Sequence, residues 1–272
     1  MRRMSTYLHG VEPVEQRRLS TLNELVNRGS LGALAASPGE HAIDFGAGLG
    51  QLTRGIARAT GIAVVGIERS AEQIAEGLRQ AAAAGEAGLL DLRQGDAATP
   101  PLQPAEWGSF DLAHTRFLLE HVQDPAAVVR AMVRSVRPGG RIVLEDDDHD
   151  VLRLWPEPAG FGPIWAAYQR SYDRNGNDPI VGRRLVSLLH AAGAEPRRSA
   201  WLPFGSCSGD PAFGLFVDNL VHILDGAREP MLQTRGVSAE QLEVGLEELR
   251  LFRERPDAAL WYGISWAEGV RP

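Results

Sequence analysis

Lysine is absent from this chain of 272 residues, so all 28 of its basic side chains are arginine. This absence excludes lysine-based chemistry, such as Schiff-base formation or a lysine general base. It also excludes a Walker-type phosphate-binding loop, which requires a lysine. Any acid–base catalysis therefore has to come from histidine, aspartate, glutamate or tyrosine.

Cysteine, long apolar runs and excess positive charge are also scarce. Cys207 is the only cysteine, which excludes an intrachain disulfide and a cysteine metal cluster. No apolar run approaches the roughly 20 residues needed to span a bilayer, and Met1 to Val11 lack the apolar core of a secretory signal. We therefore expect a cytoplasmic protein without a membrane partner. The net charge of −7 argues against a nucleic-acid partner, because phosphate binding needs a basic surface.

Short apolar segments alternate with helical patterns along most of the chain, which predicts a parallel sheet covered by helices on both faces. The expected strands begin at residue 42 and then cover 62–67, 89–94, 110–115, 141–144, 198–204 and 258–266. The expected helices cover 12–36, 71–84, 125–136, 180–192, 211–225 and 238–255, with Ser70 as an N-cap and Asp124-Pro125 opening the third. Residues around 151–175 are rich in aromatics and interrupted by Pro and Gly, and we expect them to be partly helical.

Polar residues fall at or near the ends of the expected parallel strands. They are Asp44, Glu68, Asp96, His114 and Asp146. In sheets of this kind, ligands bind beyond the carboxyl ends of the strands. Their shared placement therefore predicts a ligand site at this edge of the sheet.

The first expected strand runs into a glycine-rich turn, Asp44-Phe45-Gly46-Ala47-Gly48-Leu49-Gly50. Such a turn lets a ligand approach the bare backbone, and the amides that open the following helix bind anionic groups. The pattern favours a nucleotide-like cofactor. The dinucleotide fingerprint G-x-G-x-x-G/A requires a small residue where Gln51 stands, which disfavours an NAD-dependent oxidoreductase.

Five segments over residues 38–146, taken in order, resemble the class I S-adenosylmethionine-dependent methyltransferases. They are the glycine turn at 44–50, the acid Glu68, Gly95-Asp96-Ala97, Phe110-Asp111-Leu112 with Leu119 to Pro125, and Arg137 to Arg141. The start of the chain, from Tyr7, is similar to the N-terminal helical cap of members that act on small molecules.

The resemblance implies an α/β, Rossmann-like sheet of seven strands with helices on both faces. It also implies an N-terminal helical cap at 1–36 and a methyltransferase domain at 37–272. The segment at about 208–256 is expected to be a helical insertion between the last two strands, acting as a lid or as a contact in a homodimer.

The implied cofactor is S-adenosylmethionine, and its chemistry suits these residues. Glu68 can accept hydrogen bonds from both ribose hydroxyls. Asp96 can accept one from the adenine amino group beside the Ala97 amide, and Asp44 can orient the turn or reach the ammonium group through water. The other expected contacts are Gly46, Gly48, Gly50, Gln51, Arg69 and Arg116, the last of which is a candidate for the methionine carboxylate.

The expected activity is methyl transfer to O, N or C of a small molecule. The sulfonium is already electrophilic, so the protein must align the acceptor and exclude water, and a base helps where the acceptor carries a proton. His121 is the first candidate base, with Tyr7 as its partner by loose resemblance to phosphobase methyltransferases. His114 and His149 are the further candidates.

Two other features bear on the expected chemistry. The run Glu145-Asp146-Asp147-Asp148 suggests a metal site, but adjacent strand residues point to opposite faces and cannot all bind one ion. A solvated strand end with one or two residues near the pocket is favoured, and no metal is expected. The aromatic residues Trp155, Trp165, Tyr168, Tyr172, Trp201 and Phe204 are candidates for an acceptor pocket. A protein that binds the cofactor without methylating remains an alternative, as does an NAD-dependent oxidoreductase.

Overall fold

The computed structural model describes residues 24, 26–173 and 176–272, and these divide into two compact units. The sheet unit comprises Asn27–Asp148, Asp178–Leu202 and Gly263–Pro272. The helical unit contains His149–Asn177 and Pro203–Tyr262. Within the described part of the chain, no helix has the length and apolar character needed to cross a membrane.

The sheet unit is built on five parallel strands. They are β1 (Ala42–Phe45), β2 (Val64–Glu68), β3 (Leu90–Gln94), β4 (Phe110–Arg116) and β5 (Val136–Asp147), in the spatial order β3-β2-β1-β4-β5. The final strand, β8 (Ala259–Val270), runs antiparallel to β5, with Arg141 opposite Val270 and Asp147 opposite Ile264. Strand β7 (Glu195–Cys207) pairs with β8.

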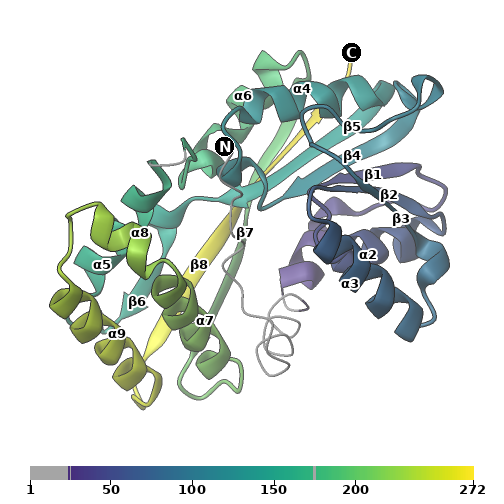
Figure 1. Cartoon of the computed structure of the whole chain (residues 1–272). Coiled ribbons are helices and arrows are strands. Elements are labelled where there is room, and N and C mark those ends of the chain that lie inside the picture. The colour runs from purple at the N-terminus through teal and green to yellow at the C-terminus, as the bar shows by residue number, and fades with distance from the viewer. Residues whose placement is uncertain (1–23, 25, 174–175) are drawn as a thin grey trace. The chain divides into compact units, whose positions relative to one another are not determined.

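Helices cover both faces of this sheet, as Figure 1 shows. Helices α4 (Pro125–Ser135) and α6 (Leu185–Ala191) lie on one face, and α2 (Gln51–Thr60) and α3 (Ala71–Ala83) on the other. Residues 26–34 form a further helix. Ser70 caps α3 by accepting from the Gln73 amide at 3.2 Å, which confirms the predicted N-cap. Asp124 caps α4 by accepting from the Ala127 amide, and the helix opens there as predicted.

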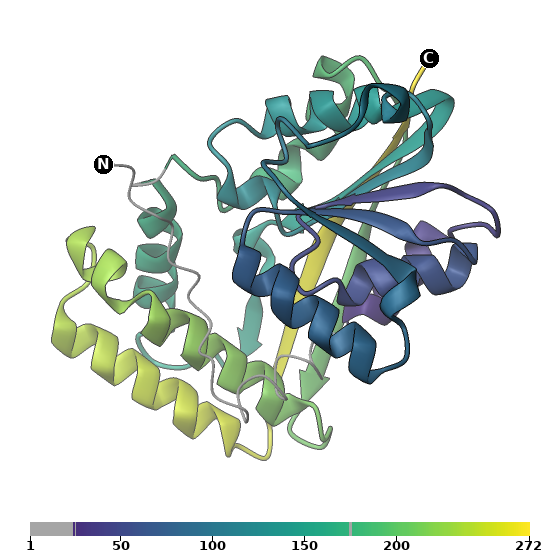
Figure 2. The ribbon, with the colours of Figure 1, turned by 45° about the vertical axis from the view of Figure 1, so that its right-hand side comes forward.

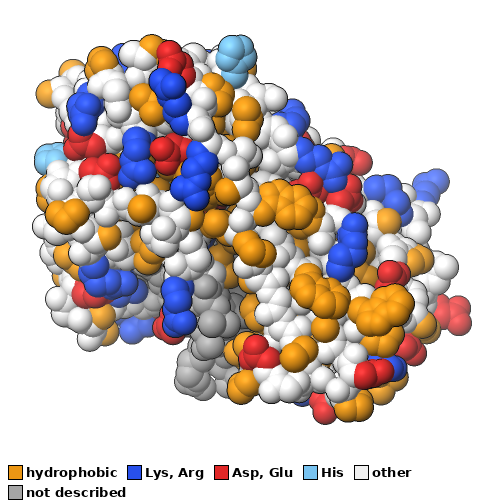
Figure 3. Space-filling model, turned by 180° about the vertical axis from the view of Figure 1, so that it is seen from behind, with side chains coloured by type: hydrophobic (Ala, Val, Ile, Leu, Met, Phe, Trp, Pro, Cys, Tyr) orange, Lys and Arg blue, Asp and Glu red, His pale blue; other side chains and the backbone are white. Residues whose placement is uncertain are grey.

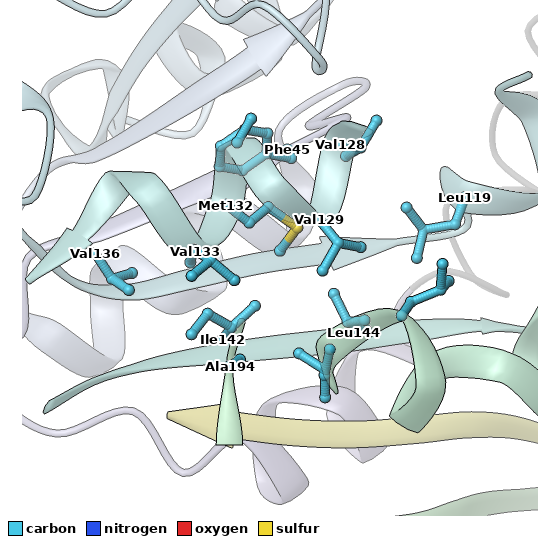
Figure 4. Close-up of a cluster of buried hydrophobic side chains, with 14 of the residues drawn as sticks. Phe45, Leu119, Val128, Val129, Met132, Val133, Val136, Ile142, Leu144 and Ala194 are labelled. Carbon is cyan, nitrogen blue, oxygen red and sulfur yellow. The ribbon is translucent and has the colours of Figure 1, made fainter. Parts of the chain in front are cut away.

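Alternate residues of each strand enter two separate cores. Ile43, Phe45, Ile142 and Leu144 pack against α4 in the cluster of Figure 4. Val143 points to the other face of the sheet and belongs to a second core. The other members of this second core include Leu34, Ala42, Leu52, Ile56, Leu112 and Trp266. Because side chains alternate along a strand, Asp44 belongs to the face of this second core, as do His114 and Glu145.

The helical unit has a core of its own. It contains α5 (Phe161–Tyr172), α7 (Phe213–Gly226), α8 (Arg228–Gln233), α9 (Ala239–Arg253) and the short strand β6 (Arg153–Trp155). Figure 2 shows α7 and α9 running side by side, and both supply residues to this core. Helices α7 to α9 lie between β7 and β8 in sequence, which confirms the predicted helical insertion.

In the described part of the chain eight strands are paired, one more than the seven expected. The additional strand, β6, pairs antiparallel with β8, so that Arg153 lies opposite Trp261 and Trp155 opposite Ala259. Three residues are too few to show a strand period, and the flanking prolines concealed the segment. Helix α8 was also missed, because it has only six residues.

Candidate cofactor site at the ends of the parallel strands

The glycine turn after β1 has the backbone that its sequence predicts. Gly46, Gly48 and Gly50 have φ angles of +76°, +55° and +69°, a region that other residues adopt only at a cost. The amides of Gly46 and Ala47 both donate to the carbonyl of Ile67 in β2, at 2.8 and 3.0 Å. The loop is thus fixed to the neighbouring strand by its own backbone.

Two glycines outside the turn allow other elements to approach it closely. A Cβ on Gly77 of α3 would lie 2.7 Å from the carbonyl oxygen of Leu49. A Cβ on Gly66 of β2 would lie 2.8 Å from that of Ala47. The turn is therefore packed against α3 on one side and β2 on the other, with no room for either added methyl group.

Glu68 ends β2 beside this turn. Its carboxylate accepts from the Gly48 amide at 3.0 Å and from the Ser70 amide at 2.8 Å. A half-buried carboxylate fixed in this way has lone pairs remaining for hydroxyl donors. Arg69 is exposed next to it, and Gln51 is half-buried at the first position of α2.

The segment after β3 is joined to the same edge of the sheet. The amide of Gly95 donates to the Glu68 carbonyl at 2.9 Å, which places Asp96 one residue from that contact. Asp96 is exposed, and one of its oxygens accepts from the Ala98 amide at 2.8 Å. Ala97 is half-buried between them. The predicted residues 44–51, 68–69 and 96–97 are thus brought to one edge.

A buried polar chain lies beneath the turn, on the face shared by Asp44, His114 and Glu145. Asp44 accepts from the Thr53 hydroxyl at 2.6 Å, and its other oxygen lies 2.8 Å from Nδ1 of His114. Nε2 of His114 lies 3.4 Å from Glu145, which also accepts from the Ser30 hydroxyl at 2.5 Å. The order of the strands explains this chain, because Asp44 and His114 are direct partners in the β1–β4 register.

His114 is completely buried and is held between two carboxylates. Burial by itself lowers the pKa of His114, but the hydrogen bonds and charges of Asp44 and Glu145 outweigh it and raise the pKa to about 9. The ring is consequently an imidazolium at neutral pH, with both of its N–H groups donating to acids.

Arg116 continues the polar chain toward the helix at residues 26–34. Its guanidinium donates to the Ser30 hydroxyl at 3.0 Å and to the side-chain oxygen of Asn27 at 2.5 Å. Burial lowers the pKa of Arg116, whereas the charges of Glu145, Asp44 and Asp147 oppose that shift. Sequence reasoning missed Asn27 and Ser30, which lie 86 or more residues away in the chain.

The predicted catalytic residues are distributed over different environments. His121 belongs to a short 3₁₀ helix at Leu119–His121; its side chain is 51% exposed, and its Nε2 lies 3.3 Å from the buried Glu120. His114 is the buried imidazolium described above, and His149 lies in the helical unit. Tyr7 lies outside the described residues.

His149 is surrounded by aromatic rings of the helical unit. The ring centroids of Trp165, Tyr168 and Tyr172 lie 5.4 to 5.6 Å from its own, in edge-on arrangements. The Tyr262 hydroxyl lies 3.3 Å from its Nδ1. Of the predicted pocket residues, Trp165, Tyr168 and Tyr172 therefore share one cluster, and Phe204 stacks on Phe216 nearby in the same unit at 5.5 Å. By contrast, Trp155 and Trp201 are largely exposed.

The acidic run at the end of β5 is not a solvated strand end, and that prediction is wrong. Asp146 is completely buried and accepts from the Leu119 amide at 2.7 Å. Burial, followed by the charges of Glu120 and Asp147, raises its pKa well above the usual value. Asp148 is also buried, and Arg183 binds it through two nitrogens at 2.6 and 2.8 Å. Other parts of the fold exclude these acids from solvent, and local sequence patterns carry no information about such tertiary burial.

On the face shown in Figure 3, acidic and basic side chains are interspersed rather than gathered by sign.

Comparisons with known proteins identify the family of this chain. A family model described as a methyltransferase domain matches residues 43–144. A ubiquinone biosynthesis O-methyltransferase of Ralstonia nicotianae is 38% identical over 196 residues, which are 71% of this chain and 77% of that protein. For four other curated relatives, the matched region spans only about half of their own length, 46 to 55%.

Solved structures share the fold at low identity. The [4+2]-cyclase SpnF has a TM-score of 0.56 and 20% identity, over 90% of this chain and 81% of that one. The geranyl diphosphate C-methyltransferase of Streptomyces coelicolor, solved with Mg²⁺, geranyl diphosphate and S-adenosyl-L-homocysteine, has a TM-score of 0.55 and 15% identity. The match covers 95% of this chain and 82% of that protein.

Proposed function

The chain belongs to the class I S-adenosylmethionine-dependent methyltransferases, and on this basis we propose that it transfers the methyl group of S-adenosylmethionine to O, N or C of a small molecule. The observation that carries the proposal is the contact between Glu68 and the Gly48 amide at 3.0 Å. This contact sets the Glu68 carboxylate beside a backbone shaped by three glycines, which supports its proposed role in binding the ribose diol.

Each part of the cofactor has a matching group at this edge of the sheet. Glu68 accepts the ribose hydroxyls, since charge-assisted hydrogen bonds of this kind are strong. The glycine turn and the opening of α2 at Gln51 receive the methionine end. Asp96 and the Ala97 amide bind the adenine, and the exposed Arg69 lies at the same edge of the sheet.

The remaining two predicted contacts have a different role in this proposal. Both oxygens of Asp44 already accept from Thr53 and His114, and the residue is buried, which supports orientation of the turn over direct contact with the ammonium group. Arg116 anchors the helix at 26–34 through two of its nitrogens, which argues against the methionine carboxylate as its main partner.

For the transfer step, the protein has mainly to align the acceptor atom with the methyl group, because the sulfonium is already electrophilic. As the methyl group moves, the S–CH₃ bond breaks, a bond to the acceptor atom forms, and the sulfonium becomes a neutral thioether. His114 cannot accept the acceptor's proton, because both of its nitrogens are already protonated and bound to acids. His121 and His149 remain the proposed bases among the described residues, with Tyr7 as the proposed partner of His121.

The acceptor is proposed to contact the aromatic cluster of the helical unit, formed by Trp165, Tyr168, Tyr172 and Tyr262 around His149. Such rings favour planar or hydrophobic molecules and also attract cations. Residues 208–256 are proposed to act as a lid or as a homodimer contact, and residues 1–36 as the N-terminal cap.

Calorimetry with S-adenosylmethionine, S-adenosylhomocysteine and NAD tests the cofactor assignment. We expect the first two to bind and NAD not to bind; binding of NAD alone would overturn the proposal. Glu68→Gln should weaken S-adenosylmethionine binding by about 1.5–3 kcal/mol, the range for a hydrogen bond to a charged group.

The matched control is Glu76→Gln on α3, because the carboxylate of Glu76 is bound by Arg79 and Gln80 of the same helix. Equal affinities of the two variants would refute the ribose assignment. Transfer itself is measured as formation of S-adenosylhomocysteine against a panel of phenols, amines and enolisable carbonyls. Conversion of an acceptor without loss of methyl donor would instead indicate a protein that uses the cofactor structurally.

A further inference from the structure

Three ionisable side chains lie beneath the cofactor turn, on adjacent strands and on the same face of the sheet. Asp44 is the third residue of β1 and His114 lies opposite it in β4, whereas Glu145 of β5 lies opposite Arg116, two residues beyond His114. All three are at most 3% exposed. A buried charge is costly unless it is paired, so a row of this kind requires a compensating gain.

The row is connected at both ends. At the β1 end, Asp44 binds Thr53 of α2 and lies two residues before Gly46. At the β5 end, Glu145 binds Ser30, whose hydroxyl also accepts from Arg116. The chain of contacts thus runs without interruption from the first turn of α2, which follows the glycine turn, to the helix at 26–34.

We propose that His114 is a positioning residue for the cofactor: it holds Asp44, and through Asp44 the glycine turn and the start of α2, in the arrangement that binds S-adenosylmethionine. This inference rests on the proposed function. His114 does not touch the reacting atoms and acts only through the groups that it orients.

Charge explains why a histidine suits this place. Asp44 and Glu145 bring two negative charges to the row, and His114 and Arg116 bring two positive ones. Without the imidazolium, the carboxylates of Asp44 and Glu145 would repel each other in a buried site. Asp44 would then turn away from Glu145, which would alter its bond to Thr53 and move the turn.

The test compares three variants by S-adenosylmethionine calorimetry at pH 7. His114→Gln keeps a hydrogen-bond donor but loses the charge, and we expect it to weaken binding about tenfold or more, as for the loss of a charged hydrogen bond. His114→Gln combined with Glu145→Gln restores the charge balance and should recover part of the affinity. The control is His190→Gln on the exposed surface of α6, which should bind like the wild type.

The pH profile separates positioning from a general structural effect. Asp44 from β1, Glu145 from β5 and Arg116 from β4 are the charged groups that face His114. Because Asp44 and Glu145 raise the pKa of His114 to about 9, wild-type affinity should be constant from pH 6 to 8 and fall as the pH approaches 9. The affinity of His114→Gln should lack this fall.

A measurement on the wild type avoids variants that fail to fold. Histidine ¹³C and ¹⁵N shifts should show one imidazolium that persists to about pH 9 and responds to added cofactor. A neutral ring at pH 7, or equal affinity of His114→Gln and wild type over the whole pH range, would overturn the inference. Failure of the wild type to bind S-adenosylmethionine at all would instead overturn the proposed function.

Discussion

Gly77→Ala should loosen the cofactor turn from the helix that supports it. In the interior of a helix, replacing glycine by alanine normally stabilises a protein by about 1 kcal/mol. At Gly77 the added Cβ would lie 2.7 Å from the carbonyl oxygen and 3.0 Å from the carbonyl carbon of Leu49. These are backbone atoms and cannot escape by a change of rotamer, so α3 or the turn has to move.

Gly32→Ala is the matched control, because Gly32 is helical and exposed and an added Cβ meets nothing within 4 Å. The gain in helix propensity is common to both variants and cancels in the comparison. The difference in unfolding free energy between them is then the cost of overpacking, about 1–3 kcal/mol. Urea unfolding measures this difference, and calorimetry measures the affinity for S-adenosylmethionine.

We expect Gly32→Ala to be slightly more stable than the wild type with unchanged affinity. Gly77→Ala should be less stable than Gly32→Ala by the overpacking cost and should bind the cofactor more weakly, because Leu49 is part of the turn. Equal stability of the two variants, together with unchanged cofactor affinity, would refute the packing argument.

Three other predictions concern the same region. Because the pKa of His114 in the folded state is raised from 6.5 to about 9, protonated His114 should contribute about 3 kcal/mol to the free energy of unfolding. This contribution should be complete below pH 6.5 and lost as the pH rises to about 9. Urea unfolding across this pH range measures it, and an unfolding free energy that does not change with pH would contradict it. Thr53→Val should lower the unfolding free energy by about 1–3 kcal/mol by leaving Asp44 with one donor fewer, whereas an unchanged midpoint would mean that water replaces the hydroxyl. Gly50→Ala should cost about 1–2 kcal/mol because φ is +69°, and a crystal structure with an unchanged turn and no loss of stability would argue against backbone strain.

Local patterns were sufficient for most of the fold. The Ser70 and Asp124 caps are short-range chemistry, with bonds to amides three residues ahead, and both helices begin where these residues predict. The alternation of strands and helices is also a local pattern, and it indicated the parallel sheet. Strand β6 escaped because its strand character comes from pairing with β8, more than 100 residues away in sequence.

The candidate site was predictable only on its cofactor side. The spacing of the glycines predicts a turn with positive φ angles, and the position of Glu68 after an apolar run predicts a strand end. The partners of Asp44 and Glu145 depend on tertiary pairing, so Thr53 and Ser30 gave no signal beyond being small polar residues in helices. The acidic run at 145–148 was misjudged for the same reason, since burial is decided by segments that fold over it.

The double hydrogen bond of the Ile67 carbonyl to the Gly46 and Ala47 amides has a thermodynamic consequence. A loop whose backbone is already fixed loses little conformational entropy when a ligand arrives, so most of the interaction energy appears as affinity. The same rigidity limits how far the loop can adjust to a ligand of another shape. Selectivity among nucleoside ligands is then enforced by a fixed backbone rather than by a loop that reshapes around each of them.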